Sequence, residues 1–355
     1  VTVPDHLTAP VLDTRPEPST EFVERVTQRL LAGEGDLLPV SALPVDGTFP
    51  VGTARWEKRG LAKEIPVWDP SICIDCGKCA LVCPHAAIRM KVFEPDLLEA
   101  APDGFLSKPY GGKDLAGMLL SIQVAPDDCT GCGVCVDVCP AVSKQDPAHR
   151  SIEMAPADDL IPAERPRWEF FTGIPEVDRS RVRRDTVKGS QLLQPLFEFS
   201  GACAGCGETP YLKLLSQLFG DRIVVANATG CSSIFGGNLP TTPWTTDAHG
   251  RGPAWSNSLF EDNAEFGLGL RLGHERHAAD ARRLLRELSD VIGEELVVAL
   301  LEAQQEDESG VAEQRARVAE LRTRLADLSG DPRARLPDSL ADERGRTSVW
   351  IVGGD

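Results

Sequence analysis

The sequence lacks any apolar run that approaches the roughly 18 residues needed to cross a membrane. It begins VTVPDHLTAP, so it also lacks an initiator methionine and the apolar core of a signal peptide. Positive charge is scarce, because 37 lysines and arginines stand against 54 aspartates and glutamates, a net charge of −17. These absences predict a soluble, cytoplasmic protein without a membrane span, and the acidity argues against a general nucleic-acid surface.

The sequence also lacks an even number of cysteines, so its cysteines cannot all pair with one another. The chain has 11 cysteines, so metal ligation is favoured over disulfides. Eight of them form two copies of the pattern C-x2-C-x2-C-x3-C-P, in the segments CIDCGKCALVCP and CTGCGVCVDVCP. The other three are Cys203, Cys206 and Cys231, and no fourth cysteine lies near them in the sequence.

The two repeats are typical of 4Fe–4S clusters. A thiol at every third position lets a loop wrap one corner of a cubane, and the Cys-Pro ligand serves the other cluster in two-cluster ferredoxins. We therefore expect two clusters, one held by Cys73, Cys76, Cys79 and Cys139, and the other by Cys83, Cys129, Cys132 and Cys135. The alternative is structural zinc, which usually takes two cysteine pairs separated by a longer segment.

The three remaining cysteines flank an expected β/α unit. Cys203 and Cys206 precede a helix predicted to begin near Thr209, because Pro210 suits a first helical turn. Cys231 follows a predicted strand over residues 223–226. Parallel sheets bind ligands at the carboxyl ends of their strands, so we expect the three thiols to meet at that edge.

Other segments predict structure rather than chemistry. A helix is expected over 19–31, an irregular segment over 40–68, and a helical hairpin over about 274–328. The region before Cys203 carries a basic patch, for which an intramolecular ion-pair surface or a solvated linker is favoured over docking of an acidic electron carrier: Arg179, Arg181, Arg183, Arg184 and Lys188. A strand over 347–352 enters a final Gly-Gly-Asp, which suggests a piece of a longer chain.

Several long phrases carry a family resemblance. They are WEKR from Trp56, the two cysteine repeats, GACAGCGETPY from Gly201, NATGCSSIFGGNLPTTPW from Asn227, and WSNSLFEDNAEFG from Trp255. In these phrases and their order the sequence resembles the pyruvate:ferredoxin (flavodoxin) oxidoreductases, the long homodimeric members of the 2-oxoacid:ferredoxin oxidoreductase family.

The resemblance implies an α/β plus α+β architecture in five parts. Residues 1–39 would be the tail of a preceding domain with a linker, and 40–68 an irregular strap of the EKR type. A two-cluster 4Fe–4S ferredoxin domain would cover 69–158, followed by a linker over 159–189. Residues 190–355 would form the first part of a parallel-sheet thiamine-diphosphate-binding domain, with the helical insertion at about 274–328.

The resemblance also implies site residues. Cys203, Cys206 and Cys231 would hold a proximal 4Fe–4S cluster whose fourth ligand lies outside this chain. Glu208 and Cys231 would contact thiamine diphosphate, and Asp355 would bind the Mg2+ of its diphosphate, as suits a hard cation.

The implied activity is oxidative decarboxylation of pyruvate, with coenzyme A accepting the acetyl group. Electrons would pass through three 4Fe–4S clusters to ferredoxin or flavodoxin in a homodimer. The regions that bind pyruvate and coenzyme A in the family are absent here, so this chain alone is expected to be inactive. Two alternatives remain: a non-catalytic iron–sulfur electron-transfer module, and the same chemistry on another 2-oxoacid.

Overall fold

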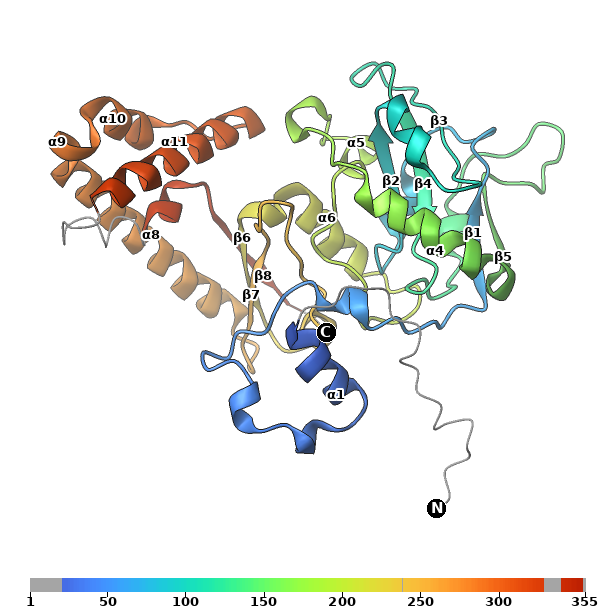
Figure 1. The fold of residues 1–355 in the computed structure, drawn as a ribbon, viewed down its shortest axis with the longest axis horizontal. Helices are drawn as coiled ribbons and strands as arrows, with labels where there is room; N and C mark the ends of the chain where they lie inside the picture. Colours follow the sequence, from blue (N-terminus) through green and yellow to red (C-terminus); the bar gives the residue numbers. More distant parts are fainter. Residues whose placement is uncertain (1–20, 238, 329–339, 354–355) are drawn as a thin grey trace.

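The protein is described by a computed structural model, which covers residues 21–237, 239–328 and 340–353. Three regions follow one another across the molecule (Figure 1). The two cysteine repeats lie in a region of short strands at the right of Figure 1, a small parallel sheet lies at the centre, and helices α8 to α11 form a lobe at the left. An N-terminal segment runs beneath the centre.

The N-terminal segment is helical and then mostly irregular. A helical stretch comprises η2 (Val23–Thr27) and α1 (Gln28–Leu31), in line with the helix expected over 19–31, whose first two residues lie outside the described residues. Three short turns follow, namely η3 (Gly35–Leu37), η4 (Val40–Ala42) and η5 (Thr53–Trp56). The many prolines and glycines of this segment and its weak apolar periodicity favour the irregular structure expected of the strap over residues 40–68.

The cysteine repeats enter two short helices, α2 (Lys78–Val82) and α3 (Val134–Asp137). Strand β1 (Glu64–Trp68) pairs antiparallel with β5 (Ile152–Pro156). The end of the expected strap at residue 68 therefore needs correction, because β1 belongs with the cysteine region: its backbone groups are paired by a strand that follows the second repeat.

A three-stranded antiparallel sheet fills the interval between the repeats. It has the order β2-β4-β3, with β2 (Ile88–Phe93), β3 (Lys108–Pro109) and β4 (Leu119–Val124), and η6 (Pro95–Ala100) lies between β2 and β3. Met90 and Leu120 are fully or almost fully buried. These strands place an apolar layer beside the cysteine loops.

The expected linker over 159–189 is also corrected, because its first half is α4 (Ala157–Gly173). This helix contains Pro162 and Pro166, and its sequence has weak apolar periodicity. Tertiary packing stabilises it nonetheless, since Phe171 is fully buried against Phe93 and Ile174. The remainder of the linker contains η7 (Arg179–Arg181) and α5 (Val187–Ser190).

The parallel sheet has the order β7-β6-β8, and both neighbours run parallel to β6 (Ile223–Asn227). Strand β6 is buried throughout. It follows α6 (Thr209–Phe219) and η8 (Gly220–Arg222), and it leads into α7 (Cys231–Gly236); β7 covers Ala254–Asn257 and β8 covers Ser348–Val352. The expected parallel sheet is confirmed, and the structure places the expected final strand, β8, beside β6.

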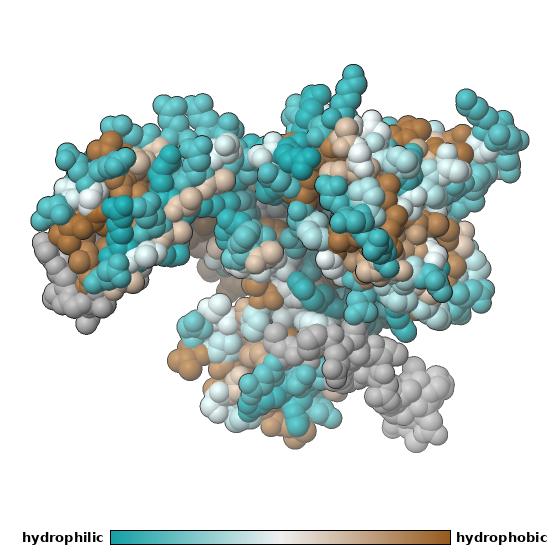
Figure 2. Space-filling model, turned by 45° about the horizontal axis from the view of Figure 1, so that its top comes forward, coloured by the Kyte–Doolittle hydropathy of each residue, from teal (hydrophilic) through white to brown (hydrophobic). Residues whose placement is uncertain are grey.

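The segment between β7 and β8 forms the helical lobe. It comprises α8 (Asn263–Glu287), α9 (Ser289–Ile292), α10 (Glu294–Glu302), α11 (Glu308–Asp327) and η10 (Ala341–Arg344). The lobe has its own apolar core, including Leu285, Leu300 and Leu321. The lobe projects from the body, and most of the visible face of the molecule is hydrophilic (Figure 2).

In the described part of the chain no helix is both long and apolar enough to cross a membrane.

Candidate iron–sulfur centres

The two cysteine loops have the same backbone design. Gly77 and Gly133 precede α2 and α3 with φ of +71° and +75°, which glycine adopts without strain. In the first loop the backbone N–H of Asp75 donates to Sγ of Cys73 at 3.5 Å. In the second loop Gly131, at the equivalent position, donates to Sγ of Cys129 at 3.4 Å. Both loops therefore direct backbone dipoles at sulfur, as a site for negatively charged thiolates requires.

Cys83 of the first repeat lies with the first three cysteines of the second repeat. These four residues line one small cavity, whose other lining is mainly apolar and includes Pro66, Ile88 and Val124. The thiols of Cys73, of Cys135 in the second repeat and of Cys76 are close enough to Cys79 to influence its ionisation. Cys139 packs in the same apolar core as Cys79. The fold thus places the last thiol of one repeat among the cysteines of the other.

Burial makes these thiols poor thiolates without a cation. Burial, reinforced by neighbouring cysteines, raises the pKa of Cys79 far above its usual value. Burial likewise raises the pKa values of Cys129 and Cys135 to about 12. A bound metal reverses this preference, because coordination deprotonates a thiol. The donor set therefore fits a metal cluster and does not fit free reactive thiols.

The cysteine pattern favours a multi-iron cluster over a single ion, because each repeat carries thiols at every third position and a final Cys-Pro ligand. The thiols of a 4Fe–4S cluster bind four separate irons and so stand around a larger group than the ligands of one zinc ion. The residues present fit two such clusters.

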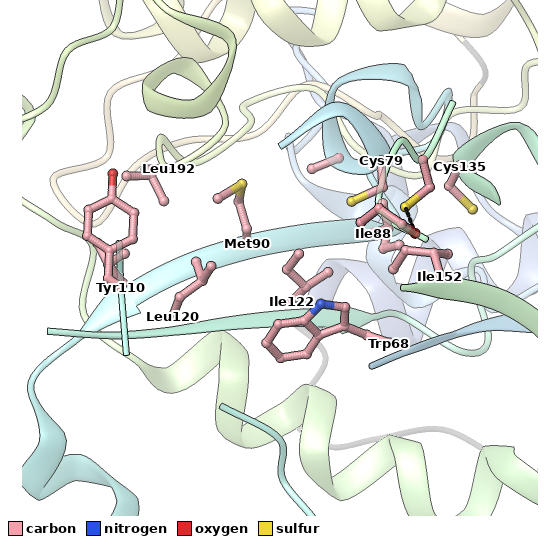
Figure 3. Packing of buried hydrophobic residues seen from close by; sticks show 14 of the residues in the cluster. Trp68, Cys79, Ile88, Met90, Tyr110, Leu120, Ile122, Cys135, Ile152 and Leu192 are labelled. Carbon is pink, nitrogen blue, oxygen red and sulfur yellow. Dashed lines mark hydrogen bonds between the residues drawn. The ribbon is translucent and has the colours of Figure 1, made fainter. Parts of the chain in front are cut away.

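An apolar layer separates the loops from water. Figure 3 shows Cys79 and Cys135 beside Ile88 and Ile152, with Trp68 and Ile122 nearby and Tyr110 at the far end of the same core. Cys79, Cys135 and Cys139 are buried, and the other five cysteines of the repeats are half-buried. Restricting water around a cluster is one of the protein's means of setting its reduction potential.

Cys203 and Cys206 lie beside the second cysteine loop. They bracket a tight turn, in which the N–H of Cys206 donates to the carbonyl of Cys203 at 3.1 Å. Gly205, within that turn, has φ of +73°, and a Cβ added to it would lie 3.8 Å from Cβ of Cys132. The turn therefore lies close enough to the second cysteine loop for one added methyl group to reach it.

The geometry of α6 and β6 brings Glu208 toward the carboxyl edge of the sheet. Helix α6 has 11 residues and β6 has five, so each spans about 16 Å. Leu212 and Phe219 of α6 pack with Ile223 and Val225. The helix runs toward the start of β6, and its own start, at Glu208, therefore lies level with the strand's carboxyl end. That is also the end from which the chain continues to Cys231.

The predicted proximal ligands are more exposed than the others. Cys203 and Cys231 are exposed and Cys206 is half-buried. Glu208 is half-buried and precedes α6. The proposed magnesium ligand Asp355 lies outside the described residues.

The basic patch is largely occupied by contacts within the chain. Arg184 pairs with Glu308, and Arg179 also reaches Glu308 at 3.3 Å. Lys188 lies 3.8 Å from Asp75 and over the ring of Tyr110. Of the two favoured interpretations, the intramolecular ion-pair surface matches the contacts of Arg179, Arg184 and Lys188, whereas Arg183 is 71% exposed, as in a solvated linker.

A larger cavity of about 560 Å³ lies between the strap, α4 and the chain around 191–199. Its walls include Lys58, Arg89 and Trp168, and none of the predicted ligands lines it. It nevertheless borders the cysteine region, because Ala80 and Lys213 also line it.

Sequence reasoning missed two cations beside the cysteine helices. Arg150 donates to carbonyls at the end of α3, and Lys213 of α6 donates to Ala80 and Leu81 of α2. Lys213 lies 133 residues from Ala80 in the sequence, and nothing in its local pattern signals the contact. Only the packing of α6 on the cysteine region shows it.

Comparisons with known proteins agree with this architecture. A domain of unknown function designated EKR matches residues 6–62, and a 4Fe-4S dicluster domain matches residues 72–142. The pyruvate-flavodoxin oxidoreductase of Trichormus variabilis is 57% identical over 330 residues, covering 92% of this chain and 28% of the relative. The pyruvate:ferredoxin oxidoreductase of Moorella thermoacetica is 45% identical over 341 residues, covering 94% of this chain and 28% of the relative.

A third relative carries a different acceptor in its name. The mitochondrial pyruvate dehydrogenase [NADP(+)] of Euglena gracilis is 43% identical over 357 residues, covering 96% of this chain and 18% of the relative. This chain thus spans about 28% of the length of the first curated relatives that it matches. With its EKR and 4Fe-4S dicluster domains, it belongs to the pyruvate-flavodoxin and pyruvate:ferredoxin oxidoreductases, of which it represents a segment.

Proposed function

We propose that the enzyme containing this chain converts pyruvate and coenzyme A to acetyl-CoA and carbon dioxide, and passes the electrons to ferredoxin or flavodoxin. This chain contributes the electron relay and part of the thiamine-diphosphate site. The observation that carries the proposal is the position of the Cys203–Cys206 turn beside the Cys132 loop, because it places a third cysteine set next to a two-cluster region. The names of the relatives supply the substrate and acceptor.

The proposed ligand sets follow the cysteine geometry. Cys83 with Cys129, Cys132 and Cys135 would hold one 4Fe–4S cluster, and the cavity that these four line supports this set. Cys73, Cys76, Cys79 and Cys139 would hold the second, supported by their shared packing. Cys203, Cys206 and Cys231 would hold the proximal cluster, with a fourth ligand outside this chain.

For the thiamine-diphosphate site, this chain supplies only a few of the proposed residues. Glu208 and Cys231 would contact thiamine diphosphate, supported by the position of Glu208 level with the carboxyl end of β6. Asp355 would bind the accompanying Mg2+. When bound, thiamine diphosphate supplies the decarboxylation chemistry and the clusters supply one-electron transfer. The chain's own residues hold these groups, exclude water with the Trp68 and Ile88 layer, and direct N–H groups at sulfur.

The same proposal includes the remaining predictions of fold and assembly. The region after residue 190 would be the first part of a thiamine-diphosphate-binding domain with helices inserted between β7 and β8. The full-length enzyme would be a homodimer. The parallel order β7-β6-β8 supports the first point.

The test is cofactor content together with turnover of the full-length protein, purified without oxygen. We expect about twelve irons per chain, because each of three 4Fe–4S clusters contains four. Bound thiamine diphosphate and coenzyme A-dependent reduction of ferredoxin or flavodoxin by pyruvate are also expected. Eight irons without thiamine binding would favour a non-catalytic electron-transfer module, and turnover of a different 2-oxoacid alone would correct the substrate.

The proximal ligands have a separate test. Cys231→Ser should remove the proximal cluster, about four irons, and leave the two clusters of the cysteine repeats. An iron content equal to that of the wild type would refute the assignment of Cys231.

A further inference from the structure

The two cysteine helices are capped by cations at equivalent positions. In the first repeat Nζ of Lys213 donates to the carbonyls of Ala80 and Leu81, the second at 2.9 Å. In the second repeat Nη1 of Arg150 donates to the carbonyls of Val136 and Asp137 at 3.0 and 3.2 Å. Ala80 and Val136 each follow the third cysteine of their repeat, so the two cations meet the same pair of carbonyls.

The two cations come from different parts of the molecule. Arg150 follows the second repeat closely and also donates to the carbonyl of Cys139 at 3.2 Å. Lys213 lies on α6, the helix that leads into the parallel sheet. The cation of the first repeat is therefore supplied by the region that holds the third cysteine set.

Lys213 is buried without a carboxylate partner. It is 2% exposed, and among the described residues no aspartate or glutamate forms an ion pair with it. Its contacts are the two carbonyls at the end of α2, where the helix dipole favours positive charge. A buried ammonium that lacks an anionic partner is destabilising, so the contacts described leave its charge incompletely balanced.

The nearest source of negative charge is the cysteine site. Burial, the largest influence, lowers the pKa of Lys213 to about 8, and the thiols of Cys83 and Cys79 oppose that effect. These two cysteines belong to different proposed clusters. A 4Fe–4S cluster with four thiolate ligands is anionic and becomes more so on reduction. The negative charges of the two clusters would therefore balance the positive charge of the Lys213 ammonium.

We propose that Lys213 is a positioning residue that raises the reduction potentials of the two clusters bound by the cysteine repeats. Its fixed positive charge stabilises the reduced, more negative form of each cluster over the oxidised form. The Ala80 and Leu81 carbonyls that Lys213 contacts lie in the sequence between Cys79 and Cys83, which belong to different proposed clusters, so the charge acts on both. This inference rests on the proposed iron–sulfur clusters.

The experiment measures midpoint potentials by redox titration, followed by electron paramagnetic resonance, on protein isolated anaerobically with its clusters. Lys213→Met should shift both potentials to more negative values. Lys213→Gln keeps an N–H donor without the charge and should shift them in the same direction. Lys213→Arg keeps the charge and should remain close to the wild type. Lys144→Met removes an exposed lysine from the same region and should change neither potential.

Iron content separates the possible failures. Neutral variants with full iron content and unchanged potentials would overturn the inference alone. If both neutral variants lose iron while Lys213→Arg retains it, the charge requirement is supported. Loss of iron from Lys213→Arg as well would overturn it in favour of a purely steric role. A wild-type protein without these clusters would overturn the proposed function and the inference together.

Discussion

Glu308 joins the helical lobe to the body of the protein, and its charge can be removed with little change of shape. It is the first residue of α11, and its carboxylate pairs with Arg184, with Arg222 at 2.5 Å and with Arg179 at 3.3 Å. The Glu308 and Arg222 side chains are only 9% and 7% exposed. Glu308→Gln would leave these guanidinium groups without their shared anion.

The expected loss of stability is about 3 kcal/mol. Removing one partner of a buried ion pair costs roughly 3–5 kcal/mol. The lower value applies because Arg222 keeps Asp221 at 3.1 Å, and because Arg179 and Arg184 are 29% and 28% exposed. Loss of a negative charge at the start of α11 adds roughly 0.3–1 kcal/mol.

Hydrogen exchange of the α11 amides would measure this loss. A change of about 3 kcal/mol corresponds to a more than 100-fold rise in the population of the open form, since 1.4 kcal/mol is tenfold. Glu313→Gln is a matched control, because Glu313 lies on the same helix and is 61% exposed in its pair with Arg317. Equal exchange rates in the two variants would refute the reasoning.

Three further predictions concern the cysteine region. Cys83→Ser should remove about four irons, those of the cluster that Cys129, Cys132 and Cys135 would hold, and should leave the cluster that includes Cys139. Iron analysis with electron paramagnetic resonance would show this. Loss of the Cys139 cluster instead would contradict the proposal that each repeat gives its last cysteine to the other repeat's cluster. Lys58→Met should lower the free energy of unfolding in urea by about 3–5 kcal/mol, because the carboxylate of Asp128, which is 4% exposed, would lose its partner at 2.5 Å. A loss below about 1 kcal/mol, the usual limit for an exposed ion pair, would contradict this prediction. Hydrogen bonds to Asp69 and then Glu153 raise the pKa of His149, so its contribution to stability is full below about pH 6.5, the usual value for histidine, and is lost as pH rises through the higher folded value. NMR titration should find that Asp69→Asn lowers this pKa, and an unchanged value would contradict the role of Asp69.

Local patterns in the sequence predicted much of the fold correctly. The helix start at Thr209, the strand before Cys231 and the final strand all follow from capping, apolar runs and turn residues. The linker over 159–189 was the main failure. Helix α4 contains two prolines and has weak apolar periodicity, so its stability depends on the burial of Phe171 against residues distant in the sequence.

The sequence by itself determined which residues are predicted to carry the chemistry. Spacing within each repeat marked eight cysteines for clusters, and the other three stand apart from both repeats. Such patterns are readable because a cubane imposes its geometry on a few consecutive residues.

The tertiary structure alone decided how these parts meet. It placed the Cys203–Cys206 turn beside Cys132 and the ammonium of Lys213 on the carbonyls of α2. It also gathered Arg179, Arg184 and Arg222 around Glu308. Each involves segments far apart in the chain, and the packing of whole elements, not any local pattern, brings the partners together.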